Sequence, residues 1–364
     1  MLYLRYDKIG DMILATGVIR AIARSHPTIT VDVLASRANS VVLERNPYVG
    51  RVILFEKKRP WTYFRTYSTV RTARYDAVID TKVQAASFTD AVLMLLSGAR
   101  HRIGVGGRDT EFALTVAVPP VESAVHYVDH SSALLAAFGA PTREGGADVR
   151  PELFLSPAER ERAVAEWGPA AGGPRLLVNV SAGDSSRYWP EEKFVATLMA
   201  ASRHVPGLVA LILRSPVDRD RAKRIASAIG GAVADTPSVR DAFALAAEAD
   251  VVFTADTSIA HAASAFSKPA VVLFPRGRGA LYGPYETAGR VVATPASSIR
   301  FLDVEPVVDA LLAVLGAAAA HRFEGWPVTP GAPVLPSAPR PFSPSVGKAA
   351  SRSAATDKSR SARP

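Results

Sequence analysis

The 364-residue sequence contains no cysteine, and this absence excludes disulfide bonds, thiolate metal sites and a cysteine nucleophile. Long apolar runs are missing too, because the strongest one, residues 91–99, is far shorter than the roughly 20 residues that a membrane-spanning helix needs. The first residues do not follow the pattern of a secretory signal. We therefore expect a cytoplasmic protein.

The signatures of several cofactor and metal enzymes are missing as well. The predicted first turn, "RYDKIGD" (5–11), has one glycine, and "GVGGRD" (104–109) lacks the third glycine of a dinucleotide fingerprint. The seven histidines form no metal-binding pattern, and neither H-E-x-x-H nor G-x-S-x-G occurs. The Tyr-x-x-x-Lys pair of a nucleotide-sugar epimerase or dehydrogenase is absent too. We expect no cofactor and no metal.

The net charge of +9 is unevenly distributed along the chain. Residues 327–364 hold six Arg and Lys against one acid, together with eight of the 27 prolines. Such a composition cannot bury a core, so we expect a disordered basic tail. The rest of the chain carries only +4 of the +9, and we therefore expect no nucleic-acid partner.

Short β-branched runs alternate with helical patterns through the rest of the chain. The predicted strands are residues 2–6, 29–34, 51–55, 76–80, 101–105, 175–181, 208–214, 250–255 and 270–274. Helical patterns cover residues 11–25, 85–98, 191–204, 218–230, 238–249 and 304–323. This alternation predicts an α/β protein with parallel sheets built from βαβ units.

A Gly/Pro-rich break, "GPAAGGPR" (168–175), divides this pattern into two series of similar length. We therefore expect two Rossmann-like doubly wound domains, residues 1–167 and 174–303, that face each other across a cleft. A helix over 304–326 and the tail over 327–364 follow them. Ligands of doubly wound sheets bind at the carboxyl ends of the strands, so the cleft is the expected site.

The first candidate residue is Asp11, which follows Gly10 where the first strand turns into the first helix. An aspartate in this place is commonly a helix cap, because its carboxylate accepts hydrogen bonds from free backbone N–H groups. The alternative interpretation is a general base that faces the cleft. Position alone favours the cap.

A second candidate site lies in "ADTSIAHAASAFSKPAVVLF" (255–274), where a strand ends and a helix begins. Thr257 and Ser258 stand at the start of this helix, whose N–H groups and dipole favour a phosphate. Asp256 is suited to bind a sugar hydroxyl, and His261 to donate to a phosphate oxygen or to fix a loop. A satisfied core histidine is the alternative for His261.

The loop after the strand at 175–181 belongs to a third stretch, "NVSAGDSSRYWPEEKF" (179–194). Ser181 and Ala182 offer hydroxyl and amide groups to a ligand. Arg187 is suited to bind a diphosphate with two parallel hydrogen bonds. A well-capped loop with an exposed arginine is the alternative.

The fourth stretch, "EKKRPWTYFRTYSTVRTARY" (56–75), interleaves six basic residues with aromatic ones against a single acid. Lys57, Arg59 and Arg65 are its candidate acceptor-binding residues. Such a pattern suits a phosphorylated glycan, a membrane surface or single-stranded nucleic acid. It is equally typical of a solvated helix face.

Taken in order, these stretches resemble glycosyltransferase family 9, which includes the ADP-heptose:lipopolysaccharide heptosyltransferases. The resemblance rests on the "IGD" and "ILAT" of the opening, on "HRIGV" (101–105), on "SSRYWPEEKF" (185–194) and above all on residues 255–274. It covers residues 1 to about 320, and the order and spacing of the segments make it more specific than any single motif.

The resemblance implies the GT-B architecture and inverting transfer from a nucleotide-sugar, ADP-linked, to an acidic glycan or lipid-linked saccharide, without a metal. It places Asp11 on the catalytic aspartate and Arg187 on a basic donor-phosphate contact that is often lysine. It also implies that Asp256, Thr257, Ser258 and His261, with Ser181 and Ala182, bind the donor, and that Lys57, Arg59 and Arg65 meet the acceptor. A helix that returns to the N-terminal domain and transient contact with the inner membrane surface are further expectations.

The sequence departs from the family pattern in three places, two of which, Ser258 and residues 275–284, concern donor binding. Ser258 stands where glycine is common, Gly17 replaces a usual proline, and "PRGRGALYGP" (275–284) replaces a Gly-Pro-Thr continuation. A member of the family that binds without turnover is therefore one alternative. A basic protein that binds nucleic acid or a membrane surface is the other.

Overall fold

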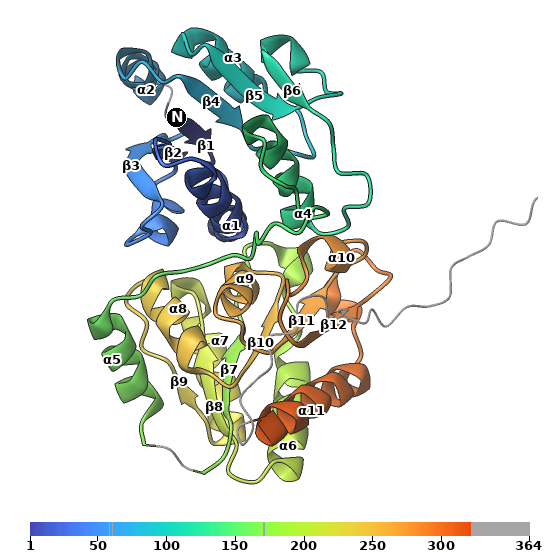
Figure 1. The fold of residues 1–364 in the computed structure, drawn as a ribbon. Helices are drawn as coiled ribbons and strands as arrows, with labels where there is room; N and C mark the ends of the chain where they lie inside the picture. Colours follow the sequence, from blue (N-terminus) through green and yellow to red (C-terminus); the bar gives the residue numbers. More distant parts are fainter. Residues whose placement is uncertain (58, 60, 170–171, 322–364) are drawn as a thin grey trace, which may run out of the picture.

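A computed structural model describes residues 1–57, 59, 61–169 and 172–321. It contains two six-stranded parallel sheets, each covered by helices on both faces (Figure 1). The first sheet has the order β3-β2-β1-β4-β5-β6 and the second the order β12-β11-β10-β7-β8-β9. Each is a doubly wound sheet whose strand order reverses next to its first strand, β1 or β7. The expected α/β fold with two Rossmann-like halves is confirmed.

The strands of the first sheet are β1 (Leu2–Leu4), β2 (Val31–Ala35), β3 (Val49–Leu54), β4 (Ala77–Asp80), β5 (His101–Val105) and β6 (Val116–Val118). Its helices are α1 (Ile9–Ser25), α2 (Trp61–Thr72), α3 (Phe88–Ser97) and α4 (Tyr127–Ser132). Short 3-10 turns are η1 (Ser40–Leu43), η2 (Glu111–Ala113) and η3 (Ala133–Phe138). The sequence did not predict β6, which is a three-residue edge strand.

The second sheet contains β7 (Arg175–Asn179), β8 (Val209–Leu213), β9 (Ala232–Val233), β10 (Val251–Ala255), β11 (Ala270–Phe274) and β12 (Gly289–Ala293). Its helices are α5 (Pro157–Trp167), α6 (Glu191–His204), α7 (Arg219–Ile229), α8 (Val239–Glu248), α9 (Ser258–Ala265), α10 (Gly279–Tyr282) and α11 (Val304–His321). The 3-10 turns η4 (Ser185–Arg187), η5 (Pro216–Asp218) and η6 (Ile299–Phe301) complete it. The inner strands β10 and β11 are buried along their whole length, as expected for strands with helices on both faces.

Helix α5 precedes the predicted boundary at 168–173 but packs on α8 of the second half. Trp167 of α5 donates to the carbonyl of Leu245 at 3.2 Å. Ser156 and Glu159 form a capping box that starts this helix. By packing, then, the second half begins near residue 156, before the Gly/Pro-rich break.

The last helix, α11, differs from the expectation that it returns to the N-terminal half. It packs against α6 and against β10, β11 and β12 of the second half (Figure 1). Its apolar residues Val307, Leu311 and Leu315 are fully buried in that core, and this burial holds the helix on its own domain. Residues 322–326 of the predicted helix and the predicted tail at 327–364 lie outside the described residues.

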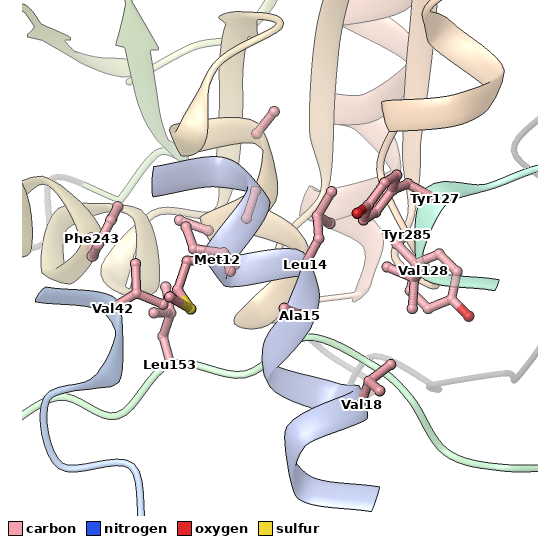
Figure 2. Close-up of a cluster of buried hydrophobic side chains, with 14 of the residues drawn as sticks. Met12, Leu14, Ala15, Val18, Val42, Tyr127, Val128, Leu153, Phe243 and Tyr285 are labelled. Atoms are coloured by element: carbon pink, nitrogen blue, oxygen red, sulfur yellow. The ribbon is translucent and has the colours of Figure 1, made fainter. Parts of the chain in front are cut away.

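The two halves share a buried cluster around α1 (Figure 2). Met12 of α1 lies with Val42 of the first half and with Phe243 of α8. Each fully buried apolar side chain contributes on the order of 1.5–3 kcal/mol. Arg240 of α8 adds polar links, because it donates to the carbonyl of Val41 at 2.8 Å and lies 3.2 Å from the carboxylate of Glu44, both in the first half. These contacts hold the carboxyl ends of the two sheets toward each other.

Candidate active site

Asp11 lies in the first turn of α1, close to the carboxyl end of β1. The backbone N–H of Lys8 donates to Oδ2 of Asp11 at 3.3 Å, so this carboxylate does cap the helix. The Asp11 side chain nevertheless keeps 28% of its surface exposed. The cap therefore leaves the carboxylate accessible to a substrate.

A buried arginine, Arg5, fixes the position of this carboxylate. Its guanidinium lies 3.6 Å from Oδ1 of Asp11 and donates to the hydroxyl of Tyr127 at 2.7 Å. A further bond, at 3.2 Å, runs from Nε of Arg5 to the Asp11 carbonyl. Sequence reasoning missed Arg5, because an arginine that follows a first strand shows its role only through the distant Tyr127.

The other half of the site begins at Thr257, the N-cap of α9. The Thr257 hydroxyl accepts the N–H of Ile259 at 3.3 Å. Asn179, at the end of β7, donates to this hydroxyl at 3.1 Å and to the Ser181 carbonyl at 3.2 Å. One side-chain amide thus joins the two predicted donor-binding segments, and Ala182 follows in the same loop.

Asp256 is buried between two arginines. Nη1 of Arg187 donates to the Asp256 carbonyl at 2.8 Å and lies 3.6 Å from its carboxylate. Nε of Arg278 donates to the same carboxylate at 2.7 Å. Two cations and one anion leave a net positive charge beside the N-terminus of α9, which suits a diphosphate. Arg278 belongs to the atypical loop 275–284 and was not among the predicted residues.

The two halves of the site meet where Gly10 lies against α9. A Cβ atom built on Gly10 would stand 2.6 Å from Cδ2 of His261 and 3.6 Å from Cα of Ser258. The helices α1 and α9 are in direct contact, so Asp11 is next to the segment predicted to bind the donor. The closeness of these helices depends on the missing side chain at position 10.

Replacement of Gly10 by alanine is expected to lower the free energy of unfolding by about 1–3 kcal/mol, because the new methyl group overlaps His261. We expect transfer activity to fall as well, since α1 must move relative to α9. Urea unfolding and initial rates measure the two effects. Gly316→Ala is the matched control, because a Cβ at Gly316 meets no atom within 4 Å. A Gly10→Ala protein as stable and active as this control would contradict the close approach.

Two buried histidines lie at this junction. Burial lowers the pKa of His261, although Asp256 and Asp11 act in the opposite direction. Burial and the neighbouring His261 lower the pKa of His126 to about 3. Both imidazoles are therefore uncharged at neutral pH. Nδ1 of His261 is buried without a hydrogen-bond partner among the described residues, and its contact with the donor stays a prediction.

A row of stacked cations and rings connects the two carboxylates. Arg278 lies over the ring of Tyr282 at 4.6 Å, and Tyr282 stacks on Tyr127 with ring centroids 5.8 Å apart. Arg5 lies over the other ring, Tyr127, at 5.0 Å. The row crosses from the second half to the first and ends at Asp256 and Asp11. Such contacts contribute about 0.5–2 kcal/mol each and align the two arginines.

A second carboxyl group, Asp80, ends β4 near the same edge of the first sheet. Burial, with the neighbouring Asp90, raises the pKa of Asp80 to about 7. The backbone N–H of Lys82 donates to Asp80 at 2.9 Å, and Nζ of Lys82 lies 2.6 Å from Asp7. An aspartate at a strand end was the signal that pointed to Asp11, and it applies equally to Asp80, which sequence reasoning overlooked.

The predicted acceptor-binding residues lie apart from this junction. Lys57, Arg59 and Arg65 are exposed, in the loop after β3 and on α2. Within the described chain, no hydrogen bond or ion pair joins them to Asp11 or α9. Their role stays a prediction.

The described residues hold no group of three or more His, Cys, Asp or Glu side chains that could bind a metal ion. Across the same residues, no helix has both the length and the apolar character to cross a membrane.

A family model described as glycosyltransferase family 9 (heptosyltransferase) matches residues 63–300. The chain belongs to glycosyltransferase family 9. The matched region contains the Arg187 and Thr257 segments but begins after Asp11. It confirms the family predicted from the motifs, and the protein is accordingly a glycosyltransferase.

Individual relatives of this family 9 glycosyltransferase are distant. Lipopolysaccharide heptosyltransferase 3 of Escherichia coli is 23% identical over 335 residues, which are 84% of this chain and 95% of that protein. The family 9 glycosyltransferase of Veillonella parvula has a TM-score of 0.75 at 16% identity and covers 87% of this chain and 97% of its own. The ADP-heptose lipopolysaccharide heptosyltransferase II of E. coli has a TM-score of 0.70 at 20% identity, over 87% and 99% of the chains. These likenesses confirm the GT-B fold of two Rossmann-like domains.

Proposed function

We propose that this protein transfers a heptose-like sugar from an ADP-linked donor to a lipopolysaccharide-core-type or other lipid-linked acidic glycan, with inversion and without a metal. The observation that carries the proposal is the contact between α1 and α9 at Gly10 and His261, which brings Asp11 next to a helix N-terminus suited to a diphosphate. The names of the relatives support heptose, ADP and lipopolysaccharide as the substrate classes.

The chemistry follows from the two faces of this contact. Asp11 accepts the proton of the acceptor hydroxyl while the hydroxyl oxygen forms a bond to the anomeric carbon of the donor. The bond from that carbon to the diphosphate oxygen breaks, and its electron pair leaves with the nucleoside diphosphate. A single displacement of this kind inverts the anomeric configuration.

The charge that develops on the leaving diphosphate needs stabilisation. Arg187, Arg278 and the N-terminal N–H groups of α9 supply it in this proposal, and such groups can replace a divalent cation. Asp256 holds both arginines in place through the bonds described above. Ser258, at the first position of α9, is expected to present its backbone N–H to a phosphate in the manner of a glycine.

A panel of nucleotides tests the donor class. ADP is expected to raise the melting temperature more than UDP or GDP do, because the nucleotide that binds most tightly stabilises the folded state most. A ligand at a hundred times its Kd stabilises the folded state by about 2.7 kcal/mol. The corresponding nucleotide-heptose should then be consumed at the same rate with and without EDTA. A stronger shift with UDP or GDP would contradict the ADP-linked donor, and loss of turnover in EDTA would contradict metal independence.

A further inference from the structure

Helix α3 is apolar on both of its faces. Its inner residues, Leu93 and Met94, are buried against the first sheet. The side chains that it exposes are all large and apolar: Phe88, Val92, Leu95 and Leu96. A helix that is hydrophobic all round is normally covered on all sides. The outer face of α3 therefore calls for a partner that the described residues do not supply.

The neighbouring helix α2 adds aromatic and basic side chains to the same layer. Trp61 is 74% exposed and Phe64 is 84% exposed. Arg65 is exposed beside Phe64, and the guanidinium of Arg71 lies against Gly98, directly after α3. The sequence from Lys57 to Tyr75 contains no acidic residue. We call the exposed side chains of α2 and α3 the outer surface.

The position of the outer surface relates it to the active site. Helices α2 and α3 form the layer of the first sheet that faces away from the second half (Figure 1). Both helices begin after the carboxyl ends of strands, β3 and β4, which is the edge that also carries Asp11. The start of α3 is tied to that edge, because Tyr6 donates to Asp90 in the first turn of α3. A substrate held next to the outer surface would thus reach the active site across the carboxyl-end edge of the first sheet.

We infer that the outer surface docks on an anionic lipid bilayer and lies in the plane of its interface. Exposed Trp, Phe and Leu side chains insert between head groups, and basic residues beside them attract anionic lipid. Residues 57–75 contain no acidic side chain, so the positive charge of this stretch is complementary to anionic lipid. A bilayer therefore accounts for the outer surface without a protein partner. The inference deepens the proposed function, in which the acceptor is lipid-linked, but its test needs neither donor nor acceptor.

The test is co-sedimentation of the full-length protein with vesicles of equimolar phosphatidylglycerol and phosphatidylcholine. Wild type is expected to bind these vesicles and to bind pure phosphatidylcholine weakly. The double variant Phe64→Ser/Leu95→Gln is expected to bind the vesicles at least about tenfold more weakly than wild type, because it loses two inserted side chains. Both sites are solvent-exposed, and an unchanged melting temperature shows that the variant folds.

A matched control, Val217→Ser/Phe301→Gln, removes two equally exposed apolar side chains from the second half, where they are 86% and 59% exposed. It should bind like wild type. Equal binding by the α2/α3 variant would overturn the inference and would assign binding to another region, such as the six basic residues of 327–364.

Two further readouts separate a bilayer from a second copy of the chain. Fluorescence is measured in a Trp326→Phe background, because Trp326 lies outside the described residues and next to the basic stretch 327–364. In this background the Trp61 emission should shift to shorter wavelength with anionic vesicles, and Trp61→Phe should remove the shift, since Trp167 and Trp189 are buried. Light scattering after size exclusion reports the oligomeric state. A dimer that Phe64→Ser/Leu95→Gln dissociates, with no vesicle binding by wild type, would overturn the inference. A blue shift that persists in Trp61→Phe would do so as well.

Discussion

Replacement of Asp11 by asparagine is expected to reduce sugar transfer by about 10²–10⁴-fold, the usual contribution of a general base. Asparagine keeps the size of the side chain and can still accept the Lys8 N–H bond that caps α1. The lost function is then proton acceptance alone. Donor affinity should be nearly unchanged, because the donor is expected to bind to the second half. Initial rates of nucleoside diphosphate release and calorimetric titration with ADP measure the two quantities.

Asp80→Asn is the matched control for this variant. Asp80 ends a strand at the same edge of the first sheet, and its pKa of about 7 makes it the rival base. Asp80→Asn is expected to retain most of the transfer activity. If Asp80→Asn removed activity and Asp11→Asn did not, Asp11 would be a helix cap only and the base would have to be reassigned.

Removal of the Arg187 side chain is expected to have the second largest effect. A charge-assisted hydrogen bond is worth about 1.5–3 kcal/mol, so Arg187→Ala should weaken ADP binding by about 10- to 100-fold. Catalysis should fall in addition, because the leaving diphosphate loses a cation. Titration of ADP measures the first effect and turnover at saturating donor the second.

Arg187→Lys is expected to restore much of the affinity relative to Arg187→Ala, since lysine keeps a cation beside the diphosphate. Arg224→Ala is a suitable control, because Arg224 forms an exposed ion pair with Glu191 on the same half of the protein. If Arg187→Ala bound ADP as tightly as Arg224→Ala does, Arg187 would serve only to hold Asp256.

The architecture was largely predictable from the sequence. Runs such as "AVVLF" (270–274) are too short for helices and wholly apolar, which is typical of an inner strand in a parallel sheet, and β11 has these bounds. The edge strands β6, β9 and β12 were missed, because strands of two to five residues are too short to show a pattern. The prediction that the last helix returns to the first half was wrong, because the apolar face of α11 packs on its own domain.

The candidate site was predictable only where the chain itself groups its residues. Asp256, Thr257 and His261 follow one another after a strand, so their common location could be foreseen. Arg5 and Arg278 could not be recognised, since each obtains its role from partners far along the chain, Tyr127 and Asp256. No local pattern shows that Gly10 must lack a side chain to let His261 approach.

The central claim is that the donor binds to the second half, at α9, and that α1 borders the same site. Hydrogen–deuterium exchange of the full-length protein with and without saturating ADP tests this claim most directly. Slower exchange is expected in two segments, residues 181–187 and 257–261, and a smaller effect at the start of α1. Protection confined to other segments, or no protection at saturation, would contradict the proposed site.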